Sequence, residues 1–288
     1  MKAAIVLLSA LLLSAAVYAR EGGTDGRLLA TGGASSLEGA AGGGITPWAV
    51  IAGYGEAQQW GTTLFTTRVQ LPDYRLDAMG VAVGYGNRVE LSVARNRFDL
   101  GSLVPRLGLP EDSLSQDVFG AKVRLFGDLI YDRLPQVALG VNYKRQKDFL
   151  IPSLVGARRD HDTEAYLAAS RLFLGGAFGY NLLLNGNLRY SRANELGLLG
   201  FGGDRRDSRS LLKEGSLAVL LNPRWAVGME YREKPDNLSF AGESDWADLF
   251  VGWFPSKRLS VVLAYARLGE IATLADQNGA YLSIQGAF

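Results

Sequence analysis

The chain of 288 residues contains no cysteine and one histidine, His161. Without cysteine it has no disulfide framework, no zinc site of the cysteine type and no thiolate nucleophile. One imidazole leaves little for a histidine metal site or a catalytic triad. We therefore predict no metal, no cofactor, no catalytic residue and no enzymatic activity.

A basic surplus and a long apolar run within the mature chain are also missing. The formal net charge is +1, whereas a protein that neutralises nucleic-acid phosphates needs many more basic than acidic groups. Beyond the first 19 residues, no stretch reaches the roughly 18 apolar residues of a spanning helix. Nucleic-acid binding and a helical membrane bundle are therefore excluded, and 48% hydrophobic residues also argue against disorder.

The amino terminus has the pattern of a secretory signal peptide. A basic head at Lys2 precedes an apolar run over residues 3–16, and Val17-Tyr18-Ala19 fits the small-x-small cleavage rule. We predict a signal peptide over residues 1–19 and one domain over 20–288, exported across the inner membrane.

Alternation with a period of two dominates from Trp48 to the end, and 36 glycines indicate a turn-rich, β-rich chain. In residues 224–232, for example, Trp225, Met229 and Tyr231 share one face and Glu230 lies on the other. The candidate strands are 46–55, 62–70, 74–85, 88–98, 116–127, 136–144, 163–174, 180–192, 211–221, 224–232, 245–254, 259–267 and 280–288.

Aromatic residues near the ends of these strands favour an antiparallel membrane β-barrel over a soluble sandwich. Tyr180 and Tyr190 are ten residues apart, about 25 Å across a membrane after a 45° tilt, which matches the apolar band of outer-membrane barrels. The predicted membrane-interface aromatics are Trp48, Tyr54, Tyr85, Tyr143, Tyr166, Tyr180, Tyr190, Trp225, Tyr231, Trp253, Tyr265 and Phe288.

The opposite faces carry charges in mid-strand, which a sandwich core would not tolerate but a water-filled lumen would. Two interpretations remain: a basic-leaning pore that selects anions, or cross-strand ion pairs that close the lumen. The predicted pore-lining residues are Arg68, Arg88, Glu90, Lys122, Arg124, Lys144, Arg171, Arg189, Glu214, Arg224, Glu230, Arg232 and Asp248.

Connection lengths alternate between short and long, as in outer-membrane barrels with short periplasmic turns and longer outer loops. Thirteen strands cannot close a bacterial barrel, which needs an even number. We predict an up-and-down barrel over about residues 27–288, with its amino terminus in the periplasm. We favour fourteen strands, with Arg27–Glu38 as the first strand; the alternative is twelve, if one candidate is not a strand.

Two loop-like glycine segments and a charged cluster leave alternatives open. Gly39–Gly44 fits a flexible bend or a segment inserted in the lumen, and Gly197–Asp204 fits an outer loop or one that folds inward. Arginines near His161 in the predicted outer loops suggest contacts with lipopolysaccharide phosphates or simply solvated loops. The Asp160-His161-Asp162 triplet offers only a weak hydrolase alternative.

Several strings resemble an uncharacterised family of bacterial outer-membrane-type proteins, a domain of unknown function. They are Gly39–Gly44 leading to Pro47-Trp48-Ala49, then Arg88–Ser92, Gly197–Asp204, Lys234–Leu238 and the last strand, which ends at Phe288. The resemblance implies a fold and an outer-membrane location, and names no substrate. The terminal aromatic strand also resembles the signal read by the barrel-assembly machinery of Gram-negative bacteria.

From these patterns we expect an outer-membrane barrel that passes a small solute through a charged, basic-leaning lumen. The alternative is a structural or accessory barrel with a plugged lumen and no transport. Outer-membrane lipids, lipopolysaccharide and the assembly machinery are the expected partners.

Overall fold

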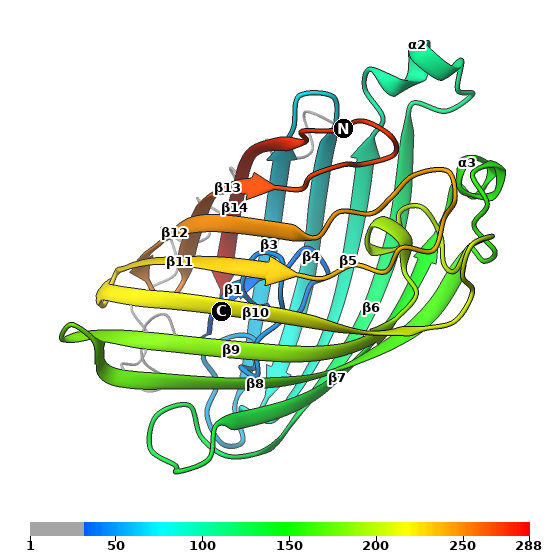
Figure 1. Ribbon diagram of the computed structural model, residues 1–288. Helices are drawn as coiled ribbons and strands as arrows, with labels where there is room; N and C mark the ends of the chain where they lie inside the picture. Colours follow the sequence, from blue (N-terminus) through cyan, green and yellow to red (C-terminus); the bar gives the residue numbers. More distant parts are fainter. Residues whose placement is uncertain (1–31) are drawn as a thin grey trace.

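Twelve antiparallel strands close into one barrel (Figure 1). The computed structural model describes residues 32–288, so the predicted signal peptide lies outside the described residues. Each strand pairs with its neighbour in sequence, and the last closes the ring on the first, with Ala287 opposite Thr63. The strands are β3 (Trp60–Gln70), β4 (Arg75–Tyr85), β5 (Val89–Asp99), β6 (Ser113–Phe126), β7 (Gln136–Gln146), β8 (His161–Ala177), β9 (Tyr180–Ser191), β10 (Ser210–Asn222), β11 (Trp225–Arg232), β12 (Trp246–Ser256), β13 (Leu259–Arg267) and β14 (Asn278–Ala287).

The all-β antiparallel barrel is confirmed with the twelve-strand alternative, and the expectation of fourteen strands is wrong. Residues 46–55 form no barrel strand. The described part of the predicted first strand, residues 32–38, carries only β1 (Ala34–Ser35), which pairs with β2 (Ala41–Gly42) instead of the barrel wall. Both segments lie inside the ring, where Figure 1 shows them in blue.

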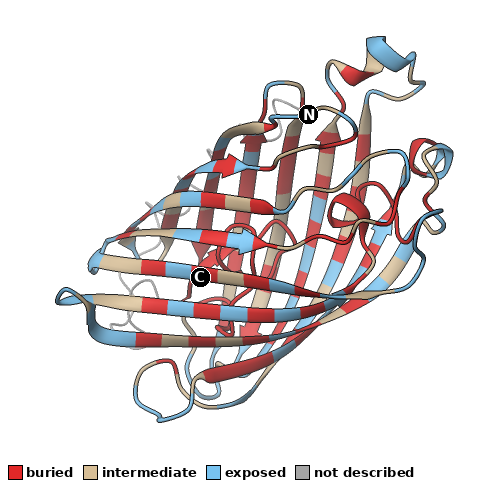
Figure 2. Ribbon diagram, viewed as in Figure 1, coloured by how far each residue is buried: buried red, intermediate tan, exposed pale blue. Residues whose placement is uncertain are grey.

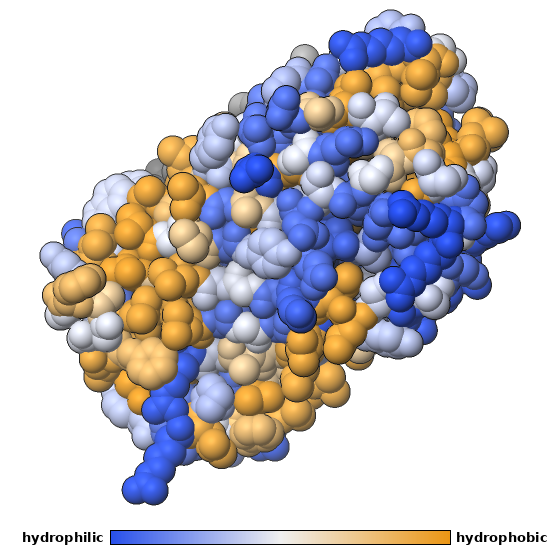
Figure 3. All heavy atoms as spheres, viewed as in Figure 1, coloured by the Kyte–Doolittle hydropathy of each residue, from blue (hydrophilic) through white to orange (hydrophobic). Residues whose placement is uncertain are grey.

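The strands alternate between buried and exposed residues because one face packs inward and the other faces outward. In β7, for example, Asn142 and Lys144 are buried whereas Val141 and Tyr143 are exposed. Figure 2 shows this alternation as bands along the strands. The exposed parity is mostly apolar, and Figure 3 shows apolar groups spread over the outer wall, with hydrophilic groups gathered toward one end.

The two ends of the barrel differ in their connections. At the turn end, β8 and β9 are joined by residues 178–179 and β10 and β11 by 223–224, while the loop end carries 100–112, 147–160, 192–209, 233–245 and 268–277. In outer-membrane barrels the short turns face the periplasm and the long loops face outside. The loops contain α2 (Leu103–Leu107), α3 (Leu150–Leu154) and the 3₁₀ turn η1 (Asn194–Gly197).

The core of the molecule is its lumen. Trp48, Val50, Leu172 and Leu183 belong to one buried cluster. A second, larger cluster joins strand residues such as Phe65 to loop residues such as Leu196 and Ile271. None of the helices within residues 32–288 is long and apolar enough to span a membrane.

Candidate functional site: the occupied lumen

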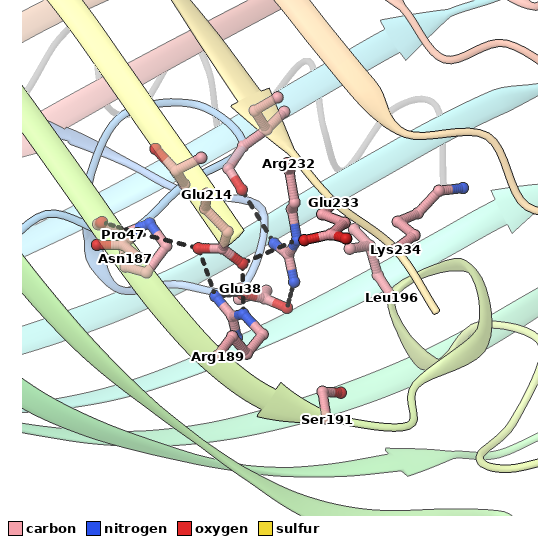
Figure 4. A network of polar contacts seen from close by, with 12 residues as sticks. Glu38, Pro47, Asn187, Arg189, Ser191, Leu196, Glu214, Arg232, Glu233 and Lys234 are labelled. Carbon is pink, nitrogen blue, oxygen red and sulfur yellow. Dashed lines mark hydrogen bonds and ion pairs between the residues drawn. The ribbon is translucent and has the colours of Figure 1, made fainter. Parts of the chain in front are cut away.

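Residues 32–59, which we call the plug, enter the barrel and make its densest set of polar contacts. At their centre is Glu38, between β1 and β2, with 1% of its surface exposed. Its Oε1 accepts hydrogen bonds from Lys144 Nζ and, at 2.8 Å, from Arg232 Nη2, and its Oε2 lies 3.2 Å from Arg189 Nη2. One plug carboxylate thus meets three cations from β7, β9 and β11. Figure 4 shows Glu38 beside two of them, Arg189 and Arg232.

Acids of the wall complete the neutralisation of these cations. Arg189 Nε donates to Glu214 Oε1 at 2.5 Å, and Lys144 Nζ lies 2.9 Å from Glu164 Oε1. The Arg189 guanidinium also lies 5.0 Å from the centre of the Tyr166 ring. Buried charges are tolerated only when paired and hydrogen-bonded, and removing Glu38 would leave cations short of a partner.

The glycine run fits against Glu230 of β11. Ile45 N donates to Glu230 Oε2 at 2.9 Å, and Thr46 Oγ1 donates to Oε1 at 2.7 Å. A β-carbon on Gly43 would collide with the same carboxylate. The absence of a side chain at Gly43 is therefore what allows the plug backbone to approach the wall. The lumen-inserted alternative for Gly39–Gly44 is the one the structure adopts.

The opposite wall holds the plug through Glu90 and Lys122. Glu90 accepts hydrogen bonds from Ala41 N at 3.1 Å and Ala52 N at 2.7 Å. Lys122 Nζ donates to Ala41 O at 2.9 Å and Trp48 O at 3.2 Å. Because the plug has little secondary structure of its own, these side chains satisfy backbone groups that would otherwise be buried unpaired.

Uncharged wall side chains hold the backbone between Pro47 and Ala49. Asn187 Nδ2 donates to Pro47 O at 2.7 Å, and Gln136 Nε2 donates to Ala49 O at 2.5 Å. Trp48 is 7% exposed, and its Nε1 donates to Ser216 Oγ at 2.9 Å. The predicted interface role of Trp48 is therefore wrong: its indole is a buried anchor in the lumen.

A loop covers the plug from the loop end. Residues 193–203 fold inward and are buried, as one alternative for Gly197–Asp204 proposed. Lys144 Nζ and Gln116 Nε2 donate to Leu196 O at 3.2 and 3.0 Å. Lys144 thereby touches both the plug and this covering loop, and links them.

A buried triad of charges fastens the covering loop to loop 233–245. Lys234 Nζ donates to Glu195 Oε2 at 2.7 Å, and Glu195 N lies 3.1 Å from both carboxylate oxygens of Glu243. Burial, and after it the charge of Glu195, raises the pKa of Glu243 to about 8. Burial also raises the pKa of Glu195, against the attraction of Lys234. Two acids thus share one cation.

The structure brings most of the predicted pore-lining residues into the lumen. Arg124 follows the inward parity near the turn end and is half-buried, whereas Arg88 and Arg224 are exposed in turns. The inward-facing set from the prediction is Glu90, Lys122, Arg124, Lys144, Arg189, Glu214, Glu230, Arg232 and Asp248.

Arg68 and Arg171 point outward, so their assignment to the lumen is wrong. Arg68 lies opposite Asp77 and pairs with it at 2.6 Å on the outer surface, where Asp77 is also 3.3 Å from Arg75. Arg171 donates to the carbonyl of Arg133. With these two outside and Glu164 inside, basic and acidic wall side chains are close to balance, so the described wall does not support a basic-leaning lumen.

Nine of the twelve predicted interface aromatics are exposed on the outer face of the barrel. Tyr54 lies in the plug and Tyr166 faces the lumen at 2% exposure, so both interface assignments are wrong. Trp60, which the prediction omitted, is exposed and its ring centre lies 4.6 Å from that of Tyr85. The predicted aromatics that are exposed on the outer face are Tyr85, Tyr143, Tyr180, Tyr190, Trp225, Tyr231, Trp253, Tyr265 and Phe288.

The sequence prediction missed Glu38 and Glu164. Glu164 lies on the same face of β8 as the buried Ser170 and Leu172. Had this pattern been given more weight than the aromatic ring of Tyr166, it would have predicted that Glu164 faces the lumen. No local signal identified Glu38, because it belongs to an irregular segment.

The arginines of the outer loops are mostly paired with acids of neighbouring loops. Arg159 pairs with Asp207, and Arg192 and Arg209 each lie 2.6 Å from Asp162. His161 is exposed, with Nδ1 2.7 Å from Asp160 Oδ1. Within residues 32–288 no three metal-ligating side chains gather into a site.

Comparison with solved structures finds outer-membrane barrels. The KdgM porin in complex with disordered oligogalacturonate aligns with a TM-score of 0.50 at 8% identity, covering 78% of this chain and 99% of that one. Omp33 of Acinetobacter baumannii aligns at 0.49 and 8% identity, covering 81% and 100%. The COG4313 outer membrane channel of Pseudomonas putida F1 aligns at 0.44 and 10%, covering 82% and 96%.

At such low identity, this likeness establishes the fold alone: a porin-like outer-membrane β-barrel. No curated protein matches the sequence. A family model described as "Protein of unknown function (DUF3034)" matches residues 31–285. The match spans the plug, the strands β3 to β13 and β14 as far as Gln285, and the chain belongs to this family.

Proposed function

We propose that the protein is an outer-membrane barrel whose own amino-terminal plug keeps the lumen closed to small solutes. The observation that carries this proposal is the position of Glu38, paired with cations from β7, β9 and β11. A segment held from three strands blocks the centre of the barrel more effectively than a loop attached at one side.

Passage of a small solute, the function expected from the sequence, then requires the plug to move. Its contacts favour a reversible closure, because they are hydrogen bonds, ion pairs and apolar packing. With the plug displaced, Lys122, Arg189 and Arg232 would be exposed beside Glu90 and Glu230. A wall of mixed sign supports weak ion selectivity and not the strong anion preference of a basic ring.

Location in the outer membrane and assembly there belong to the same proposal. Phe288 is exposed on the outer wall, and its backbone exchanges hydrogen bonds of 2.8 Å in both directions with Thr62. We propose that the assembly machinery reads this strand before it closes the ring. His161 lies in the exposed loop-end region, away from the plug contacts, and the proposal gives it no catalytic role.

Conductance in a planar bilayer tests the plug. The substitution Gly43→Val places a branched side chain against Glu230 and should expel the plug, whereas Gly186→Val adds the same atoms where nothing lies within 4 Å. We expect the wild-type protein and the Gly186→Val control to be silent and Gly43→Val to show discrete steps. Steady conductance in the wild type would contradict the proposal, as would silence in a correctly folded Gly43→Val protein.

A further inference from the structure

A groove hollows the outer wall of the barrel. It lies on β10 to β13 toward the loop end and has a volume of about 560 Å³, within the usual range for small-molecule sites. Its outward-facing lining residues are Gly215, Leu217, Met229, Tyr231, Ala247, Leu249, Tyr265 and Arg267. We call this the outer groove.

The strand register explains the hollow. Tyr231 lies opposite Gly215 on one side and opposite Ala247 on the other, and Ala247 lies opposite Arg267. Small and large outward side chains therefore alternate across four strands, so that Gly215 and Ala247 form the floor between taller neighbours. Gly186, opposite Gly215 on β9, extends the low floor by one more strand.

The groove continues along the wall toward the turn end. A second hollow of about 360 Å³ shares Leu217, Met229 and Leu249 with it and adds Val219 and Val251. The shared hollow is apolar along its length. Such a surface, inside the apolar band of a membrane barrel, fits a hydrocarbon chain.

The rim at the loop end carries two cations and two acids. Arg267 and Lys213 are exposed, and no carboxylate within residues 32–288 pairs with either side chain. The nearby acids accept hydrogen bonds from neutral donors and keep their charge: Asp245 accepts from Tyr231 Oη at 2.5 Å, and Glu233 accepts from Lys213 N at 2.8 Å. An anionic group above the apolar hollow would have Arg267 and Lys213 as its cationic partners.

We propose that the outer groove binds lipopolysaccharide, with an acyl chain over Gly215 and Ala247 and a phosphate at Arg267. The loop end faces outside, where the anionic glycolipid of the outer leaflet combines both chemistries in one molecule. Arg267 can hold a phosphate with two parallel hydrogen bonds. The site rests on the membrane location of the barrel and is independent of whether the plug opens.

Native mass spectrometry of the full refolded mature protein, titrated with purified lipid A, tests the site. Ala247→Phe fills the floor and Arg267→Gln removes the rim charge, while Ala121→Phe adds the same ring to the outer face of β6 as a matched control. Heat-modifiable migration on gels reports folding of each variant, and Arg267→Gln keeps the test valid if Ala247→Phe misfolds.

We expect each groove variant to bind lipid A about tenfold more weakly, because Arg267→Gln removes one charged hydrogen bond and Ala247→Phe displaces one well-packed acyl chain. Ala121→Phe should bind like the wild type. Equal binding by all four proteins would overturn the proposal. Phosphatidylglycerol that competes as well as lipid A would overturn the assignment to lipopolysaccharide, since any anionic lipid would then suffice. Conductance of Gly43→Val is a separate readout, so failure of the plug leaves this test intact.

Discussion

Glu38 and Arg189 lie 3.2 Å apart at the centre of the barrel, one in the irregular plug and the other in β9. Each is 1% exposed, and each has further partners of opposite charge. The pair joins the plug to the wall of the barrel. It therefore couples closure of the lumen to stability of the barrel.

Replacing Glu38 by glutamine should destabilise the protein by about 3 to 5 kcal/mol, because it leaves buried cations without their shared carboxylate. The measurement is urea unfolding followed by heat-modifiable migration. Asp117→Asn is the matched control, since it breaks a pair with Arg95, which is 59% exposed, and exposed pairs contribute about 1 kcal/mol or less. An equal fall in the free energy of unfolding in the two variants would contradict the role of Glu38 as the residue that anchors the plug.

The inward orientation of Tyr166 predicts a strong effect at Gly140. The two residues lie opposite each other on β8 and β7, and a β-carbon on Gly140 would collide with the Tyr166 ring. Gly140→Val should cost about 1 to 3 kcal/mol through overpacking, measured by the same unfolding assay. Gly186→Val, on the open outer face, should cost far less. If Gly140→Val left the free energy of unfolding unchanged, the Tyr166 ring would have to lie outside the lumen.

Much of the fold could be predicted because alternation is a local signal. Residues 224–232 and 136–144 show it without interruption, and they correspond to β11, which begins at Trp225, and β7. Aromatic strand ends and alternating loop lengths then favoured a membrane barrel over a soluble sandwich. These signals depend only on neighbouring residues within each strand or loop.

The errors have a common physical origin. Trp48 and Tyr166 look like interface aromatics in sequence, yet both find polar partners inside a filled lumen. The pattern of residues 46–55 resembles a strand because the segment is buried on all sides, and burial alone favours apolar residues. Nothing local distinguishes a segment buried in the lumen from one buried against lipid, so the plug, Glu38 and the strand number required the tertiary structure.

The Glu195, Lys234 and Glu243 triad predicts that the covering loop loosens in base. The pKa of Glu243 is about 8 in the folded protein against an ordinary value of 4.5. Between these pH values Glu243 keeps its proton in the folded loop but loses it in the unfolded loop, so the free energy of unfolding falls as pH rises. This contribution to stability is lost completely above about pH 8. Below pH 4.5 the stabilisation is fully present.

Trp246 provides a local probe of this change, because Lys234 Nζ lies 4.9 Å from its ring. We expect its fluorescence to change between pH 6 and 9 in the wild type. Glu243→Gln, which stays neutral, should abolish the change. A transition that survives in Glu243→Gln would assign the pH dependence to another group.

The position of the plug can be measured directly by a disulfide, since the natural chain contains no cysteine. Thr46 Oγ1 and Ser216 Oγ lie 2.6 Å apart across the plug and β10. The double substitution Thr46→Cys with Ser216→Cys should therefore cross-link spontaneously when the folded protein is oxidised, as shown by peptide mapping under non-reducing conditions. Thr46→Cys with Leu217→Cys is the control, because Leu217 is the next residue but faces outward. Cross-linking in the first protein alone is the result we predict; its absence in a folded barrel, or equal cross-linking in both, would contradict a plug seated in the lumen.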